Sequence, residues 1–362
     1  MEILEFSLTV FPIFFGVQEV VAQDLKLVNV LFRHGDRAPL TDDGESFPTS
    51  PYLCSKFLPY GPSQLTNEGR QREYDLGIHI RQQYDEFLGA LYHPAEIIAR
   101  STDTDRTKMS LQLVMAGLFP PAPEQKWNPK LDWQPVIADY IPRTDSVVYP
   151  FDCPQYQEEF EVVEQSPDVQ EEISQHSELL KNLTEWTGQP VTKAKDFEHL
   201  YGYLSSLNAM GLELPDWTQG IFPDGELLDL AVLSYRIQSY TQRLKVLNGG
   251  KILKNFTENM QAVVDGTESQ MKMFLLSGHD LNIGALLIAL EVYEPHQPQF
   301  SSAVFLELLE DEGEYFVSIF YYLGIPPERT AVAIPGCEKL CPFKKFVELY
   351  SQVIPTEEDM IC

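Results

Sequence analysis

The chain has 362 residues, enough for two domains or for one large domain with an insertion. Hydrophobic residues make up 44% and charged residues 22%, an ordinary globular composition that excludes a disordered or fibrous chain. The 54 acidic and 26 basic residues give a formal net charge of −28, and such a surface repels nucleic-acid phosphates and anionic lipid headgroups. An anionic substrate would therefore need a local cationic pocket.

Residues 1–22 have the pattern of a secretory signal peptide. The apolar run Phe6–Val17 is too short to span a bilayer, and Val20–Ala22 supplies small residues at the expected cleavage point. Because acidic residues replace the usual basic start, a buried N-terminal helix is the alternative. No later run is long enough for a membrane span, so we expect a protein without a membrane anchor, secreted or lysosomal. Two sequons, at Asn182 and Asn255, offer sites for N-linked glycans.

Three short apolar runs are predicted strands, and each leads into a polar turn and then a helical pattern. The runs are Leu25–Phe32, Glu96–Ala99 and Met271–Leu276. One helical stripe contains Leu76, Ile80, Tyr84, Phe87, Leu88 and Leu91. Two later strands, joined as a hairpin through a loop that contains Gly313, are predicted at Ala303–Leu309 and Tyr315–Tyr322. Strands alternating with helices predict an α/β fold, a three-layer sandwich with a mainly parallel sheet.

Residues 153–246 differ in character, because they are acidic and rich in helix formers. A long amphipathic helix is predicted over Leu227–Leu247, and it stops at Asn248-Gly249-Gly250, a helix C-terminal signal. We expect residues 153–246 to form a smaller helical domain, inserted into an α/β domain made of residues 23–152 and 247–362.

The five cysteines are an odd number, which in a secreted chain leaves one thiol free or bonded to another chain. Cys337 and Cys341 are close enough to close a small loop. We expect a second disulfide between Cys153 and Cys362, with Cys54 left over, and pairing of Cys153 with Cys54 is the alternative. A zinc site is disfavoured, because no second closely spaced ligand pair accompanies Cys337 and Cys341.

Cationic side chains follow the first three predicted strands. The strands end at Arg33-His34, at Arg100 and at His279-Asp280. In a parallel sheet, ligands bind beyond the carboxyl ends of the strands, so these residues are expected to meet at one edge. The alternative is that these residues form no common site, because polar residues are common at strand ends.

The segment Arg33-His34-Gly35-Asp36-Arg37 suggests phosphate chemistry. Guanidinium groups bind phosphate oxygens in a fork, and Gly35 allows close approach of the backbone. Neighbouring positive charge lowers the pKa of a histidine, and the neutral imidazole is a nucleophile. The segment therefore predicts attack by His34 on a phosphorus atom held by arginines. The alternative is a structural histidine beside arginines in surface ion pairs.

These motifs resemble those of the histidine acid phosphatase family, a branch of the phosphoglycerate-mutase-like superfamily. The similarity rests on Arg33-His34-Gly35-x-Arg37-x-Pro39, on Arg100-Ser101-Thr102-Asp103 and on His279-Asp280, and it extends from about Leu25 to Cys362. It is greatest with the secreted, lysosomal and prostatic acid phosphatases. One departure is Ala303, which stands where close relatives carry a cysteine of an additional disulfide.

The resemblance implies hydrolysis of phosphate monoesters through a phosphohistidine on His34. Asp280 would protonate the leaving oxygen and then help to activate water. The phosphate would be held by Arg33, Arg37, Arg100 and His279. The resemblance also implies that no metal or other cofactor is needed, that the substrate is a small phosphomonoester or a phosphoprotein, and that the protein is a homodimer.

Three other functions compete with this one. A phytase, an inositol-phosphate phosphatase or a mutase would belong to the same superfamily, but a phytase pocket is expected to be strongly cationic. A metallophosphohydrolase could use His34, Asp36, His279 and Asp280 as ligands, although the nearby arginines would repel a divalent cation. A secreted binding protein on a retired phosphatase scaffold would be expected to have lost catalytic groups.

Overall fold

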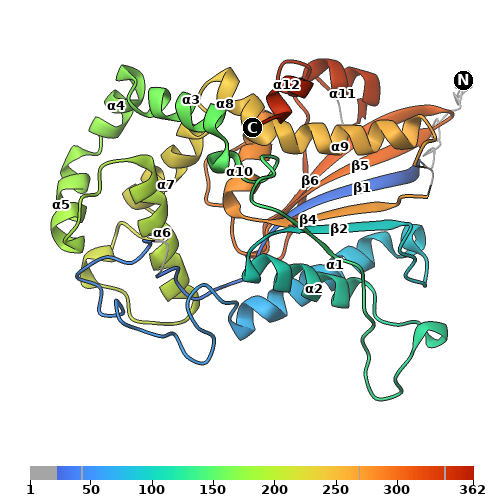
Figure 1. The fold of residues 1–362 in the computed structure, drawn as a ribbon, viewed down its shortest axis with the longest axis horizontal. Coiled ribbons are helices and arrows are strands. Elements are labelled where there is room, and N and C mark those ends of the chain that lie inside the picture. Colours follow the sequence, from blue (N-terminus) through green and yellow to red (C-terminus); the bar gives the residue numbers. More distant parts are fainter. Residues whose placement is uncertain (1–22, 42–43, 269, 338–339) are drawn as a thin grey trace, which may run out of the picture.

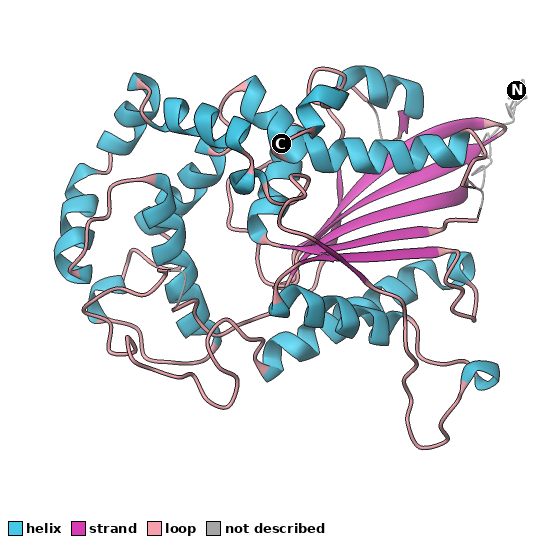
Figure 2. Ribbon diagram, viewed as in Figure 1, coloured by secondary structure: helices cyan, strands magenta, loops and turns pink. Residues whose placement is uncertain are grey.

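A computed structural model describes residues 23–41, 44–268, 270–337 and 340–362. The predicted signal peptide, residues 1–22, lies outside the described residues. Figure 1 shows a twisted sheet covered by helices on both faces, with a lobe of helices at the carboxyl ends of the central strands. The strands gather on one side of the molecule and the lobe contains only helices and loops (Figure 2).

The sheet has the strand order β3-β2-β4-β1-β5-β6-β7, and β8 pairs with β6. The strands are β1 (Asp24–Arg33), β2 (Ile97–Thr102), β3 (Asp139–Ile141), β4 (Met273–Gly278), β5 (Ala303–Asp311), β6 (Glu314–Tyr322), β7 (Arg329–Val332) and β8 (Cys341–Pro342). The four strands β3, β2, β4 and β1 are parallel, whereas β5, β6, β7 and β8 pair in antiparallel fashion. The α/β sandwich is therefore confirmed, and its parallel half is the half in which strand ends converge.

Two hydrophobic clusters fill the spaces between the sheet and its helices. Helices α1 (Asn67–Leu88) and α2 (Asp105–Leu118) cover one face, where Val28, Val30 and Phe32 of β1 point. Helices α9 (Gly249–Val264), α10 (Asp280–Ala289) and α11 (Phe343–Leu349) cover the other face, where Leu27 and Leu31 point. The alternation along β1 is that of a strand buried on both sides.

The predicted apolar stripe faces the sheet as α1. Leu76, Ile80, Tyr84 and Leu88 are buried, and Phe87 packs against the same cluster. The helix begins after Thr66, whose hydroxyl accepts a hydrogen bond from the Gly69 N–H, and it ends at Gly89, which has a φ of 71°. Leu91 lies beyond that end.

The segment predicted to be a helical domain holds six of the described helices. They are α3 (Pro154–Glu164), α4 (Pro167–Ser174), α5 (Ser177–Thr187), α6 (Ala194–Ala209), α7 (Glu226–Ile237) and α8 (Gln242–Leu247). They enclose a third hydrophobic cluster, which Ala38, Phe47 and Phe57 join from the loop after β1. The division into domains stays a prediction, and these three residues show that the loop after β1 packs with the helices.

The single long helix predicted over Leu227–Leu247 is wrong. The chain forms α7 and α8, separated at residues 238–241, and the Thr241 hydroxyl caps α8 by accepting from the Leu244 N–H. Gly249 and Gly250 begin α9, and their role is close packing: a Cβ would lie 2.0 Å from the Ala285 carbonyl oxygen at Gly249 and 2.3 Å from that of Val353 at Gly250.

Two disulfides are present, Cys153–Cys362 and Cys337–Cys341, and Cys54 is a free, exposed thiol. This is the predicted pairing. The final helix, α12 (Glu357–Met360), precedes the Cys362 terminus. Within the part of the chain that the structure describes, no helix is long and apolar enough to cross a membrane.

Candidate active site

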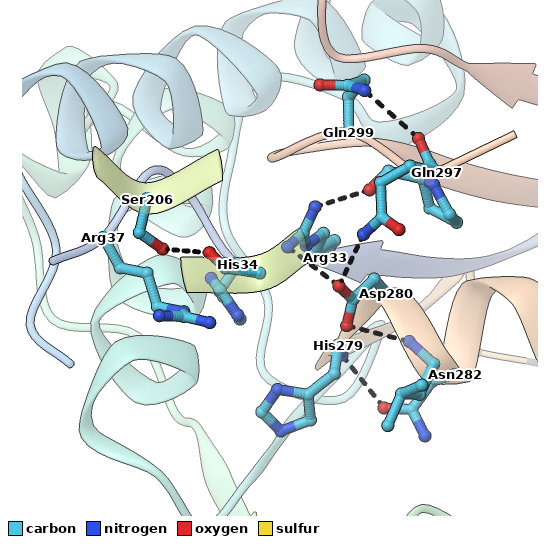
Figure 3. A network of polar contacts seen from close by, with 12 residues as sticks. Arg33, His34, Arg37, Ser206, His279, Asp280, Asn282, Gln297 and Gln299 are labelled. Carbon is cyan, nitrogen blue, oxygen red and sulfur yellow. Dashed lines mark hydrogen bonds and ion pairs between the residues drawn. The ribbon is translucent and has the colours of Figure 1, made fainter. Parts of the chain in front are cut away.

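Adjacent parallel strands bring the two predicted histidines together. Arg33, the last residue of β1, is in register with Gly278, the last residue of β4. His34 and His279 therefore leave the sheet side by side, and their ring centroids are 5.5 Å apart at an interplanar angle of 73°. His34 is only 2% exposed. Figure 3 shows both rings pointing into the space beyond the strand ends.

The His34 ring is oriented by its own backbone. Its Nδ1 lies 2.9 Å from the carbonyl oxygen of Gly35, and because a carbonyl only accepts, Nδ1 carries the proton. Nε2 is then left with a free electron pair. Burial, followed by the charges of Arg106 and Arg33, holds the pKa of His34 well below its usual value, so the ring stays neutral in acid.

The turn that carries His34 needs glycine on both sides of a close contact. A Cβ at Gly35 would lie 2.4 Å from the Gly69 carbonyl oxygen, and a Cβ at Gly69 would lie 2.1 Å from that of Asp36. The first turn of α1 therefore packs directly against the backbone beside His34. The Gly35 N–H also donates to the Ser110 hydroxyl of α2, at 3.2 Å.

His279 is held between a threonine and an arginine. Its Nε2 lies 3.0 Å from the Thr102 hydroxyl at the end of β2, and Arg106 Nη2 lies 3.5 Å from Nδ1. Since a guanidinium group only donates, Nδ1 accepts and Nε2 carries the proton. Burial and the charge of Arg106 hold the pKa of His279 well below its usual value.

Asp280 begins α10 and receives donors on both carboxylate oxygens. Oδ2 accepts from Arg33 Nη2 at 2.9 Å and from Gln297 Nε2 at 2.9 Å, whereas Oδ1 accepts from the Leu281 N–H at 3.0 Å (Figure 3). Burial is the largest single influence and would raise the pKa of this carboxyl, but Arg33, His279, Arg37 and the Leu281 N–H together outweigh it, and the pKa is lowered. Asp280 is therefore ionised in the free protein.

The two arginines of the first motif are both buried and both paired. Arg33 donates to the Pro298 carbonyl oxygen at 2.5 Å and stacks over the Phe300 ring at 4.2 Å, in addition to its ion pair with Asp280. Arg37 makes a two-pronged ion pair with Glu45, with Nη1–Oε2 at 3.0 Å and Nη2–Oε1 at 2.5 Å. Arg33, which was predicted to hold the phosphate, is not among the residues that line the pocket and pairs with Asp280, whereas Arg37 lines the pocket itself.

A pocket of about 270 Å³ opens over these side chains. His34, Arg37, Arg106, His279 and Asp280 line it from the sheet side. Helix α6 contributes Glu198 and His199 from the opposite wall, and Arg143, Tyr149 and Asp152 lie at the rim. Burial, with a smaller contribution from the charge of Asp280, raises the pKa of Glu198 to about 8. Sequence reasoning did not single out Glu198 or Glu45, since nothing in the local pattern sets them apart from other acidic residues.

The prediction that Arg100 lines the site is wrong. Strand β2 continues to Thr102 and does not stop at Ala99, so Arg100 lies inside the strand, in register with Leu276 and Asp139. Leu276 belongs to the cluster on the α9 face, and neighbours in register share a face. The arginine that reaches the pocket is Arg106, the second residue of α2.

Other predicted sites can be placed as well. Asn182 lies on α5 and Asn255 on α9, both half-buried, and the Thr257 hydroxyl of the second sequon donates to the Leu253 carbonyl oxygen. Among the residues that the structure describes, no group of three or more His, Cys, Asp or Glu side chains is placed to hold a metal ion. The pocket instead gathers guanidinium and imidazole groups, which suit a phosphoryl anion.

Comparisons with known proteins find similar chains and similar folds. The venom acid phosphatase of Apis mellifera is 45% identical over 344 residues, which are 94% of this chain and 88% of that protein. The prostatic acid phosphatase of Homo sapiens is 33% identical over 363 residues, covering 97% of this chain and 92% of that protein. Among solved structures, a phytase from Klebsiella has a TM-score of 0.69 at 15% identity, covering 94% of this chain and 98% of that one, which is a likeness of fold.

A family model is matched as well, and it spans most of the chain. The model of the histidine phosphatase superfamily (branch 2) matches residues 24–322, a range that begins with β1 and ends with β6. It includes His34, His279 and Asp280. The chain therefore belongs to the histidine phosphatase superfamily, branch 2.

Proposed function

We propose that this chain is an acid phosphatase in which His34 is the nucleophile, Asp280 the proton donor, and Arg37, Arg106 and His279 the phosphate ligands, with the His279 Nε2–H turning from the Thr102 hydroxyl to a phosphoryl oxygen when substrate binds. The observation that carries the proposal is the neutral His34 ring, whose Nδ1–H is tied to the Gly35 carbonyl and whose Nε2 electron pair is free in a pocket lined by arginines. The acid phosphatase relatives, at 33% and 45% identity, support this activity over that of a phytase, for which only the fold is shared.

The reaction has two half-reactions. The Nε2 electron pair of His34 forms a bond to phosphorus while the ester P–O bond breaks, and the electron pair of that bond leaves with the alcohol oxygen, which takes a proton from Asp280. Water then attacks the phosphohistidine and gives a proton to the Asp280 carboxylate. The N–P bond breaks, phosphate leaves and His34 is restored. Positive charge on Arg37 and Arg106 stabilises the equatorial oxygens in both transition states.

An acid optimum follows from the lowered pKa of Asp280 in the free protein. The carboxylate must gain a proton before it can act as an acid, and Arg33 opposes this. A bound phosphoryl group places negative charge beside Asp280 and weakens that opposition, so the pKa of Asp280 rises in the complex. Activity is expected to fall as the pH rises through that value.

The test is hydrolysis of p-nitrophenyl phosphate by the purified protein from pH 3 to 8, with and without EDTA. We expect an acid optimum and a loss of about 10³-fold or more in His34→Ala. Asp280→Asn should lose about 10²–10⁴-fold with an alkyl phosphate and less with the nitrophenyl ester, whose leaving group needs little protonation. A base-stable phosphoryl label on the wild type and not on His34→Ala would identify the intermediate. Wild-type rates in His34→Ala would overturn the proposal.

The same proposal includes secretion or lysosomal delivery through residues 1–22, glycans on Asn182 and Asn255, and a homodimer. The venom and prostatic relatives support a protein of the secretory pathway. A dimer is supported by the loop before the edge strand β3, which projects from the body (Figure 1) and exposes 59% of Trp127, 41% of Trp133 and 62% of Ile137. Sedimentation equilibrium of the wild type and of Ile137→Glu tests the dimer, which is expected only for the wild type.

A further inference from the structure

Asp280 is connected to the helical lobe through two buried polar side chains. Gln297 lies in the loop between α10 and β5 and is 7% exposed, and its Nε2 donates to Asp280 Oδ2 at 2.9 Å. Its Oε1 accepts from the Tyr235 hydroxyl of α7, also at 2.9 Å. Tyr235 is 3% exposed. Figure 3 shows the Gln297 amide turned toward the Asp280 carboxylate beside Arg33.

The orientation of the Gln297 amide follows from its two neighbours. The ionised carboxylate of Asp280 only accepts, so it requires the NH₂ end of the amide. Burial and the charge of Asp280 raise the pKa of Tyr235 well above its usual value, so the hydroxyl keeps its proton and can donate to Oε1. The Tyr235 ring is itself fixed by α10, since its Cδ1 lies 3.2 Å from where a Cβ at Gly284 would stand.

The two donors on Oδ2 leave the other oxygen for the reaction. Arg33 and Gln297 both donate to Oδ2, whereas Oδ1 accepts only from the adjacent Leu281 N–H among the residues that the structure describes. A proton added to Oδ2 would face two N–H groups, so the carboxyl is protonated on Oδ1. When Oδ1 gives that proton to the leaving oxygen, Asp280 becomes a carboxylate whose Oδ2 is already paired, which stabilises the product of the transfer.

We propose that Gln297, held by Tyr235, is a positioning residue that fixes the orientation of Asp280 and strengthens it as the acid of the reaction. This inference rests on the proposed function, because it assumes that Asp280 donates the proton. In the proposed reaction Gln297 touches neither the phosphate nor the leaving group. It acts through Asp280 alone.

Other charged and titratable groups also face Asp280. Arg33 comes from β1, Arg37 from the loop after it, Glu198 from α6 and His279 from the preceding position in the chain. Substitution of Gln297 removes none of these charges. A change in the pH profile of a Gln297 variant therefore reports the lost hydrogen bond and not a lost ion pair.

The experiment compares Gln297→Leu, Tyr235→Phe and Gln299→Leu with the wild type. Gln299 is a matched control, because it is two positions away and its side chain bonds to the Gln297 backbone at 3.3 Å and not to Asp280. For each variant, kcat/KM is measured from pH 3 to 8 with p-nitrophenyl phosphate and with an alkyl phosphate.

Without the Gln297 donor, Asp280 becomes a weaker acid that holds its proton to higher pH. We expect the alkaline limb of the pH profile of kcat/KM for Gln297→Leu to move up by about one pH unit. The rate at the acid optimum should fall by about tenfold with the alkyl phosphate and hardly at all with the nitrophenyl ester. Tyr235→Phe keeps the amide but frees it to turn, so both effects should appear in reduced size. Gln299→Leu should resemble the wild type.

Two results would overturn the inference. An unshifted limb in both Gln297→Leu and Tyr235→Phe, or an equal loss with both substrates at every pH, would mean that these residues only support the fold. Thermal unfolding shows whether each variant folds. If either Gln297→Leu or Tyr235→Phe does not fold, the pH profile of the other one tests the role of Gln297. Asp280→Asn separates the two proposals. If this variant keeps the wild-type rate with the alkyl phosphate, the proposed function fails. If Asp280→Asn is inactive and Gln297→Leu behaves like the wild type, only the role of Gln297 is rejected.

Discussion

Arg106 and Arg100 provide a direct test of how the phosphate is held. Arg106 lines the pocket beside His34 and His279, whereas Arg100 lies inside β2 on the side of the sheet that α9 covers. We expect Arg106→Ala to lower kcat/KM by about 10²–10³-fold, the usual effect of removing one donor to a charged transition state. Its inhibition constant for inorganic phosphate should rise in parallel.

Arg100→Ala is the control for that measurement. We expect it to stay within about threefold of the wild type, because a side chain remote from the reacting atoms makes no contact that changes in the transition state. A larger loss in Arg100→Ala than in Arg106→Ala would show that the sequence-based assignment was right and that the geometry is misleading.

Glu198 is the residue whose titration should be visible in stability. Burial raises its pKa to about 8, whereas in the unfolded chain it titrates near its ordinary value of 4.5. The folded protein thus keeps the proton over a range in which the unfolded chain loses it. Stability from this group is complete below about pH 4.5 and is lost as the pH rises toward 8.

Glu198→Gln mimics the protonated form and should remove this pH dependence. The Gln238 amide donates to Glu198 Oε2 at 3.0 Å and can donate equally to a glutamine oxygen. The variant and the wild type should unfold alike at pH 4, and at pH 7 the variant should be more stable by about 1–3 kcal/mol. Urea unfolding at both pH values measures this, with the exposed Glu185→Gln of α5 as control. If the difference in free energy of unfolding between Glu198→Gln and the wild type were the same at both pH values, the raised pKa of Glu198 would be contradicted.

For individual residues, the sequence predicted which kinds of side chain form the site better than it predicted which arginine reaches the pocket. His34, His279 and Asp280 were predicted to lie together because they follow the ends of two strands, and the structure brings them together at the edge of the parallel part of the sheet. Arg106 was missed because the predicted strand ended at Ala99, whereas β2 continues to Thr102. The shorter predicted strand placed Arg100, and not Arg106, at the site. Gln297 and Glu198 come from segments distant in the chain, and their neighbours are set by tertiary packing alone.

Among the elements, α1 and α2 depend on two glycines that no periodicity identifies. A Cβ at Gly77 of α1 would lie 2.1 Å from the Val114 carbonyl oxygen of α2, and a Cβ at Gly117 of α2 would lie 2.3 Å from that of Tyr74. The two helices therefore touch backbone to backbone. Apolar spacing predicts which face of a helix is buried, but it does not predict how closely two helices approach.

Gly77→Ala should force these helices apart. Because the obstacle is backbone and not a flexible side chain, we expect a loss of about 2–3 kcal/mol in the free energy of unfolding. Gln82→Ala, on the exposed face of the same helix, controls for helix propensity and should change little. Urea denaturation should show a lower midpoint with an unchanged slope. A Gly77→Ala protein as stable as the wild type would mean that the two helices adjust without cost.

Over the whole molecule, the two disulfides constrain very different lengths of chain. Cys153–Cys362 joins residues 209 apart, linking the start of the helical segment to the last residue, whereas Cys337–Cys341 joins residues 4 apart. Both include a cysteine that is nearly fully buried, Cys153 at 1% and Cys341 at 0%, so loss of packing is comparable when either pair is replaced. The difference between them is then mainly the entropy of the unfolded chain.

Replacing each pair by alanine should separate these contributions. Chain entropy predicts a loss of about 5 kcal/mol for Cys153→Ala with Cys362→Ala and about 2 kcal/mol for Cys337→Ala with Cys341→Ala. Double variants are needed, because a single one would leave a thiol able to exchange with the exposed Cys54. Unfolding in urea of the two double variants and the wild type gives both losses. Equal losses would mean that local packing and not chain entropy accounts for the stabilisation, and that the long bridge does little to hold the helical segment to the sheet.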